Sequence, residues 1–187
     1  MRIISGSKKG KKILLPDPKI TRPLRDSVKE NIFNILLHSR NFRTQFNKIK
    51  VVDFFSGSGS FGLECISRGA EIVKFYENDP KTLNTLFRNL DNNFNKKKFE
   101  IINKDFFLVE KEKMIENFKP NLIFFDPPYK IEKFDKVYSF INSLSKYKNL
   151  LIIFHVEKTK IINFENFKHQ EEKIYGLSKV FFLKTNS

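Results

Sequence analysis

Cysteine, histidine and tryptophan are scarce in this sequence, which contains one, three and none of them, respectively. The lone Cys65 cannot form an internal disulfide, and we expect it to be a small buried apolar side chain of a helix. No apolar run approaches the roughly 18 residues that a membrane span requires. The first six residues also lack the apolar core of a signal peptide, so we expect a cytoplasmic protein with no membrane partner.

Arginine is scarce too, and it is distributed unevenly. Only seven of the 35 basic residues are arginines, and five of the seven lie in residues 1–50, which carry +10 of the net charge of +14. A basic segment attached to a nearly neutral domain is typical of a nucleic-acid-binding protein, although such runs are often only a solvated face. The candidate nucleic-acid contacts are Arg2, Lys8, Lys9, Lys11, Lys12, Arg22 and Arg25.

The first 50 residues differ in pattern from the rest of the chain. Residues 2–5 and 11–15 are short strand-like runs around a polar tip bounded by glycines, which predicts a β-hairpin. Ser27 and Glu30 fit a capping box and predict the start of a helix, after which residues 39–50 form a polar linker. We therefore divide the chain into a basic N-terminal extension, 1–50, and a main domain, 51–187.

The main domain alternates strands and helices. Residues 106–118 predict one amphipathic helix. Two strands near the C-terminus are joined by only three residues, too few for a parallel crossover, so they should be antiparallel. The expected fold is α/β and Rossmann-like, with a seven-stranded, mostly parallel sheet that ends in an antiparallel hairpin. The predicted strands are residues 51–55, 71–76, 99–103, 121–126, 150–154, 171–175 and 179–184.

A glycine-rich loop follows the first of these strands. Its glycines allow a tight turn and the close approach of a ligand to the backbone. The next strand ends in an acid, Glu77, 20 residues after Gly57. A carboxylate at that position can accept hydrogen bonds from both hydroxyls of a ribose. Asp105, just beyond the third strand, either accepts a hydrogen bond from an adenine amine or caps a helix.

The residues Asp126-Pro127-Pro128-Tyr129 end the fourth strand. Two prolines remove two backbone donors, so Asp126 lies at the carboxyl end of a buried strand, where open α/β sheets bind ligands. Asp126 and the Pro127 carbonyl can accept the N–H groups of a nucleobase amine, while Tyr129 stacks on the base. A plain turn between strand and helix is the alternative interpretation.

The same glycine loop and acid would fit a nicotinamide-binding fold. A dehydrogenase would need a general acid beside its hydride acceptor. The three histidines, His38, His155 and His169, follow no such pattern, and a lone histidine is more often structural. The 126–129 segment has no evident role in hydride transfer, but it has one in the transfer of a methyl group to a base nitrogen.

The whole chain resembles the RsmD-type 16S rRNA (guanine-N2-)-methyltransferases, which are class I S-adenosylmethionine-dependent enzymes. The glycine loop and Asp-Pro-Pro-Tyr are shared by many amino-methyltransferases, so the arginine–proline stretch before the core is what indicates this family. Two departures from the family pattern occur there, at Leu24 in place of a second threonine and at Ser27 in place of arginine. The matching segments are residues 1–6, 21–30, 53–62, 126–129 and 175–176.

The resemblance implies S-adenosylmethionine as the cofactor and the N2 amine of a 16S rRNA guanine, conventionally numbered 966, as the methyl acceptor. It also implies that residues 51–187 form the cofactor-binding catalytic domain, in which catalysis is mostly positioning and Asp126 stabilises the charge that develops on nitrogen. The implied cofactor-binding residues are Asp53, Gly57, Ser58 and Gly59 for the methionine end, Glu77 and Asn78 for the ribose, and Asp105 for the adenine. The implied catalytic residues are Asp126, Pro127, Pro128 and Tyr129.

Two other functions stay open. A DNA adenine or cytosine amino-methyltransferase shares the chemistry but must flip a base, usually with an added recognition domain, and about 50 residues outside the core are too few for most of these. A noncatalytic RNA-binding protein of the same fold is the second alternative. We expect a monomer without a metal, which acts on 16S rRNA within a small ribosomal subunit or its assembly intermediate.

Overall fold

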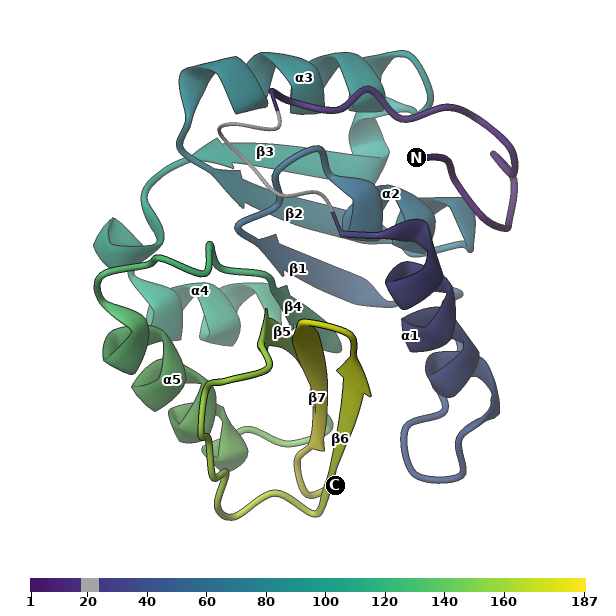
Figure 1. Cartoon of the computed structure of the whole chain (residues 1–187). Coiled ribbons are helices and arrows are strands. Elements are labelled where there is room, and N and C mark those ends of the chain that lie inside the picture. Colours follow the sequence, from purple (N-terminus) through teal and green to yellow (C-terminus); the bar gives the residue numbers. More distant parts are fainter. Residues whose placement is uncertain (18–23) are drawn as a thin grey trace.

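One seven-stranded sheet organises the chain, of which the computed structural model describes residues 1–17 and 24–187 (Figure 1). Five neighbouring strands run parallel, and the last two run antiparallel, so the predicted sheet and its C-terminal hairpin are confirmed. In spatial order the strands are β3 (Phe99–Asn103), β2 (Ile72–Glu77), β1 (Lys50–Phe54), β4 (Leu122–Phe125), β5 (Leu151–Glu157), β7 (Ser178–Lys184) and β6 (His169–Tyr175).

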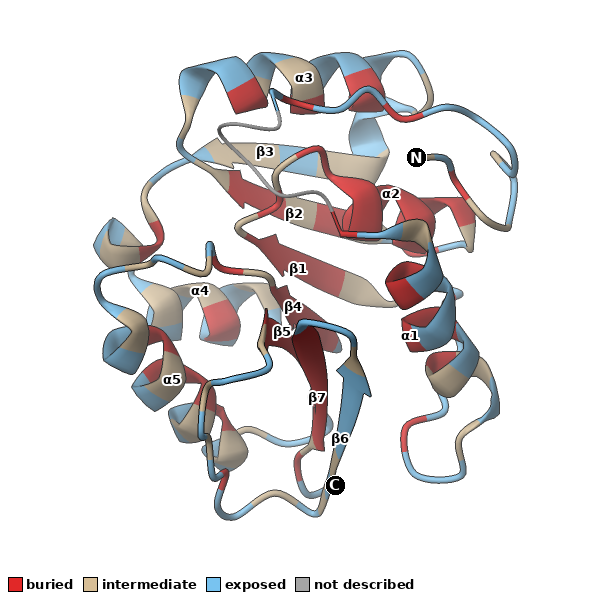
Figure 2. Cartoon of the chain, viewed as in Figure 1, coloured by how far each residue is buried: buried red, intermediate tan, exposed pale blue. Residues whose placement is uncertain are grey.

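Helices cover both faces of the sheet. Because successive strand residues point to opposite faces, β1 sends Val51 into one core and Val52 and Phe54 into the other. Figure 2 shows the central strands buried and β6 largely exposed at the edge. In the part of the chain that the structure describes, no helix combines the length and apolar character needed to cross a bilayer. The first core contains α1 (Asp26–His38), α2 (Ser60–Ser67) and α3 (Pro80–Asp91); the second contains α4 (Lys111–Phe118) and α5 (Phe134–Ser143).

Two helix boundaries differ from the prediction. Helix α1 begins at Asp26, with Arg25 as an N-cap that makes no side-chain hydrogen bond, so the predicted capping box is wrong. The predicted helix over 106–118 is also interrupted. Asp105 accepts a hydrogen bond from the Phe107 amide at 2.8 Å and caps a single 3-10 turn, Phe106–Leu108, before α4 begins.

The predicted N-terminal hairpin is present but short. Its arms are joined by one antiparallel bridge, between Arg2 and Lys12, and by backbone hydrogen bonds between residues 1–3 and 10–13. It is also held on α2, because the Ser7 amide donates to the Ser67 carbonyl at 2.8 Å. Gly6 has a φ of +82°, and a Cβ there would lie 1.9 Å from the same carbonyl oxygen. The turn is therefore shaped by contact with the helix as well as by the pairing of its two arms.

The N-terminal extension packs into the first core. Ile3 and Ile13 are buried there. Phe42 is buried there too, so the prediction of a polar linker over residues 39–50 missed the buried aromatic residues of that stretch. Two buried charges reinforce the contact. Glu64 of α2 accepts hydrogen bonds from the amides of Ile4 and Ser5 at 2.6 and 2.9 Å, and from Arg68. Lys29, whose pKa is lowered by burial, donates to the Arg2 carbonyl at 2.8 Å and to Ser60. The division of the chain at residue 50 stays a prediction.

We expect Glu64→Ala to destabilise the protein by about 3–5 kcal/mol, because it leaves Arg68 and two amides without their buried acceptor. Urea unfolding followed by circular dichroism measures the loss. Glu71→Ala, at an exposed position of the same charge type, is the control. Equal stability of the two variants would contradict a structural role for Glu64.

Candidate active site

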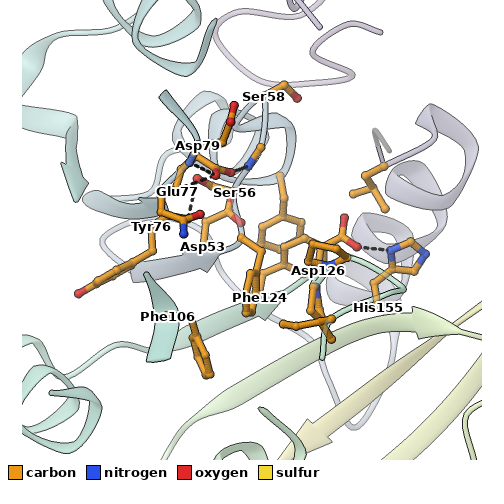
Figure 3. Close-up of a pocket in the computed structure, with 18 of the residues that line it drawn as sticks. Asp53, Ser56, Ser58, Tyr76, Glu77, Asp79, Phe106, Phe124, Asp126 and His155 are labelled. Carbon is orange, nitrogen blue, oxygen red and sulfur yellow. Dashed lines mark hydrogen bonds and ion pairs between the residues drawn. The ribbon is translucent and has the colours of Figure 1, made fainter. Parts of the chain in front are cut away.

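A cavity of about 580 Å³ opens at the carboxyl end of the parallel strands (Figure 3). The chain leaves β1 for β2 on one side, and β4 lies on the other, so the cavity lies at the switch point where open α/β sheets bind ligands. Of the residues predicted for cofactor binding and catalysis, all but Gly59 line this cavity. They are Asp53, Gly57, Ser58, Glu77, Asn78, Asp105, Asp126, Pro127, Pro128 and Tyr129.

The glycine loop connects β1 to α2 beneath the cavity. Gly59 has a φ of +78°, and a Cβ there would lie 2.5 Å from the side chain of Leu86, so both conformation and space require glycine. Gly57 has a φ of +55°, and nothing lies within 4 Å of the position of its Cβ. A ligand can therefore approach the backbone at Gly57, whereas Gly59 serves the packing of the loop against α3.

Glu77 holds this loop in place. One carboxylate oxygen accepts a hydrogen bond from the Gly57 amide at 2.9 Å, and the other accepts from the amides of Asn78 and Asp79 at 2.9 and 3.0 Å. Asp79 in turn caps α3 by accepting a hydrogen bond from the Thr82 amide at 2.7 Å. The Thr82 side chain and this amide lower the pKa of Asp79. The acid predicted to face a ribose thus also fixes the loop that would face the rest of the ligand.

Asp53 is a buried carboxylate with one unpartnered oxygen. It is 1% exposed, and its Oδ2 accepts a hydrogen bond from the Gly62 amide at 3.0 Å. Its Oδ1 has no partner among the described residues. Burial raises the pKa of Asp53 well above its usual range, and the nearby charges of Asp126 and Glu77 raise it further. A cationic group beside Oδ1 would satisfy that oxygen and stabilise the ionised form.

Asp126 makes a contact that the sequence analysis missed. Its Oδ1 lies 2.8 Å from Nδ1 of His155, a residue that we had interpreted as a lone structural histidine (Figure 3). The parallel register of β4 and β5 predicts this contact, because Phe125 pairs with Phe154 and the residues that follow them, Asp126 and His155, are therefore neighbours. Tyr129 lies on the same side, with its ring centroid 6.5 Å from that of His155.

Asp105 makes the cap that the sequence left open as one alternative, and its role toward an adenine stays a prediction. It caps the 3-10 turn and also lines the cavity. The next residue, Phe106, lines the cavity as well and packs its ring edge-on against Phe54 at a centroid distance of 5.1 Å. The sequence predicts Phe106 only as part of a helix, whereas the structure places it in a 3-10 turn at the wall of the cavity.

The predicted nucleic-acid contacts are not gathered at the cavity. The amide of Lys8 donates to Ser67 at the C-terminal end of α2, whereas the N-terminal end of this eight-residue helix borders the cavity, about 12 Å away. Arg2, Lys9, Lys11 and Lys12 belong to the same bridged turn. Arg25 is exposed and follows Leu24, which lines the cavity. Arg22 lies outside the described residues.

The strand order, the glycine loop after β1 and the acid-proline pair after β4 define a Rossmann-like methyltransferase fold. The chain belongs to the family described as "Conserved hypothetical protein 95", which it matches over residues 1–184.

Known proteins resemble the chain along most of its length. Ribosomal RNA small subunit methyltransferase D from Haemophilus influenzae is 32% identical over 182 residues, which cover 95% of this chain and 90% of that protein. The solved structure of a hypothetical protein from Thermus thermophilus has a TM-score of 0.80 at 19% identity, with 99% of both chains covered. The rRNA methyltransferase aviRa from Streptomyces viridochromogenes has a TM-score of 0.63 at 14% identity, with 87% of this chain and 85% of that chain covered. These two structural likenesses concern the fold alone.

We expect Asp53→Asn to stabilise the ligand-free protein, and to do so more strongly as the pH rises. The raised pKa means that the native wild-type protein loses stability as the pH rises from about 4 through the native pKa of Asp53, where a buried charge forms. Asparagine keeps an acceptor for the Gly62 amide and carries no charge. Thermal unfolding of both proteins between pH 5 and 9 measures the difference, at about 2–4 °C for each kcal/mol. A difference that is constant with pH would contradict this account.

Proposed function

We propose that this protein transfers a methyl group from S-adenosylmethionine to the N2 amine of a guanine in 16S rRNA, at the position conventionally numbered 966. The observation that carries the proposal is one cavity that contains both the unpartnered Oδ1 of buried Asp53 and the carboxylate of Asp126 at the end of β4. The first suits the cationic end of the cofactor, and the second suits the amine that receives the methyl group.

The donor set fits the cofactor. Asp53 Oδ1 would accept a hydrogen bond from its ammonium group, and the backbone of Gly57, Ser58 and Gly59 would approach its methionine carboxylate. Glu77, with Asn78 beside it, retains acceptor capacity for the ribose hydroxyls, since each carboxylate oxygen has more than one lone pair. Asp105 would accept from the adenine amine. When bound, S-adenosylmethionine supplies a methyl group on a positively charged sulfur, and the carboxylates that line the cavity, among them Asp53, Glu77 and Asp126, favour that charge.

The acceptor side of the cavity holds and orients the amine. Asp126 and the Pro127 carbonyl would each accept one N–H, which turns the nitrogen lone pair toward the methyl group. Pro127 and Pro128 fix the backbone that carries these acceptors, and Tyr129 would stack on the base. As nitrogen bonds to carbon it becomes positive, and the charge of Asp126 stabilises it. The amine then loses a proton, and because the leaving group is neutral no strong base is needed beforehand.

The basic N-terminal extension, residues 1–50, supports an RNA substrate. Its lysine-rich turn lies at the far end of α2 from the cavity, so an RNA that touches both would extend well beyond the target nucleotide. Such an RNA suits a folded ribosomal substrate, either a small subunit or its assembly intermediate, and the cytoplasm is where these are found. In this proposal the protein acts as a monomer, with residues 51–187 as the catalytic domain.

Glu77→Gln should weaken binding of S-adenosylmethionine by about 1.5–3 kcal/mol, because it replaces a charged hydrogen-bond acceptor by a neutral side chain of nearly the same shape. Isothermal titration calorimetry measures the change, with Glu71→Gln as the matched exposed control. Binding of a nicotinamide dinucleotide by the wild-type protein, without binding of S-adenosylmethionine, would overturn the cofactor assignment.

Asp126→Ala should slow methyl transfer on the order of a hundredfold or more while leaving RNA affinity nearly unchanged, because its contact matters most as nitrogen becomes positive. Tyr129→Ala should lose stacking of roughly 1–3 kcal/mol, and Tyr129→Phe should stay close to wild type because the ring is kept. Single-turnover methylation of unmodified small subunits measures all three variants.

Mass spectrometry of the modified nucleoside tests the target in the same reactions. N2-methylguanosine at one site supports the proposal. Methylated adenine or cytosine in a DNA substrate would support the DNA amino-methyltransferase, and RNA binding without methyl incorporation would support the noncatalytic alternative.

A further inference from the structure

Core packing alone does not explain why a histidine occupies position 155. It is 4% exposed on β5, beside Asp126 in the parallel register. The neighbouring buried positions on the same side of β5, Leu151 and Ile153, are apolar and belong to the first core. A polar ring among such residues costs free energy unless its polar atoms are bonded, so an apolar residue would be the better choice for packing.

The imidazole has one hydrogen-bond partner in the part of the chain that the structure describes, and it is Asp126. The Nδ1 to Oδ1 distance is 2.8 Å, whereas Nε2 is buried and has no described partner. Within residues 1–17 and 24–187, the ring therefore makes its one polar link to the carboxylate and no second hydrogen bond.

The carboxylate depends on the same contact. Among described residues, Asp126 Oδ1 is bonded only to His155, and Oδ2 has no hydrogen bond to any of them. The Asp126 backbone is fixed by the prolines that follow and by a long 3.4 Å hydrogen bond from its amide to the Phe54 carbonyl. These contacts fix the backbone and leave the side-chain torsions of Asp126 to the histidine.

We propose that His155 is a positioning residue for methyl transfer: its neutral ring donates the Nδ1 proton to Asp126 Oδ1 and so holds Oδ2 toward the amine. This inference rests on the proposed function for the role of Asp126. A neutral donor fixes the carboxylate without cancelling its charge, which the developing positive nitrogen requires. The 126–129 segment and a histidine from the neighbouring strand thus form one unit, although 29 residues separate the two partners.

A matched pair of amide variants tests which ring nitrogen matters. His155→Asn puts an amide nitrogen where Nδ1 lies, within reach of Asp126, whereas His155→Gln puts it near Nε2, out of reach. Single-turnover methylation of small subunits should be within a few-fold of wild type for His155→Asn and slower by about 10- to 100-fold for His155→Gln. Affinities for S-adenosylmethionine and RNA should be unchanged in both. His169→Phe, at the partly buried histidine of edge strand β6, is the control.

Three results would overturn the proposal. Equal slowing of both amide variants would assign the role to Nε2 or to the whole ring. A wild-type rate for His155→Gln, or a loss confined to RNA affinity, would show that the Nδ1 contact does not position Asp126 for methyl transfer. A thermal unfolding midpoint for each variant identifies any loss that comes from unfolding, and the Asn-to-Gln comparison then decides among variants that fold.

A spectroscopic measurement separates this inference from the proposed function, because it needs no substrate. Nitrogen-15 NMR of the ligand-free protein at pH 8 should show the neutral Nδ1–H form of His155. Asp126→Ala should shift it toward the Nε2–H form, which free histidine prefers. If the wild-type protein already has the Nε2–H form, His155 does not donate to Asp126 and the inference is wrong, whatever the enzyme methylates. If the tautomer is as expected but no RNA is methylated, the proposed function fails instead.

Discussion

The site depends on the parallel pairing of β1 with β4. Phe54 pairs with Phe125, and both strands end at this level, so the glycine loop and Asp126 leave the sheet side by side. A stacked ring pair joins the two strands, Phe54 on Phe125 at 5.1 Å between centroids, and a second one, Phe61 of α2 on Phe124 at 4.1 Å, packs the helix after the glycine loop on β4. A slip of one residue would turn Asp53 to the opposite face, so the aromatic core of the sheet also determines the chemistry at its edge.

The N-terminal extension is connected to the same edge through Asn89 of α3. The Asn89 side chain is 2% exposed and bonds both the amide and the carbonyl of Leu14, at 2.8 and 2.9 Å. Its amide also donates to the carbonyl of Ser58 in the glycine loop at 2.9 Å. One buried side chain therefore joins the segment proposed to face RNA to the loop proposed to face the cofactor, and neither can shift without disturbing the other.

The sequence predicted features that local chemistry determines, and it missed those that depend on register or packing. Continuous apolar runs revealed the parallel strands, and the two prolines revealed where β4 ends. The capping box at Ser27 was wrong because α1 already begins at Asp26, so Ser27 lies inside the first turn of the helix and not before it. The partner of Asp126 became visible only with the β4–β5 register, and the unpartnered oxygen of Asp53 only with the packing around it.

In the proposed reaction, three of the carboxylates that line the cavity would affect turnover as well as binding. Asp53, Glu77 and Asp126 all line the cavity, and a bound cation would stabilise the ionised form of buried Asp53, whose charge would be only weakly screened by salt. In the proposed reaction the spent cofactor carries one positive charge fewer than the one that entered. In that reaction the cavity would attract fresh cofactor more strongly than product, which would favour exchange after each catalytic cycle.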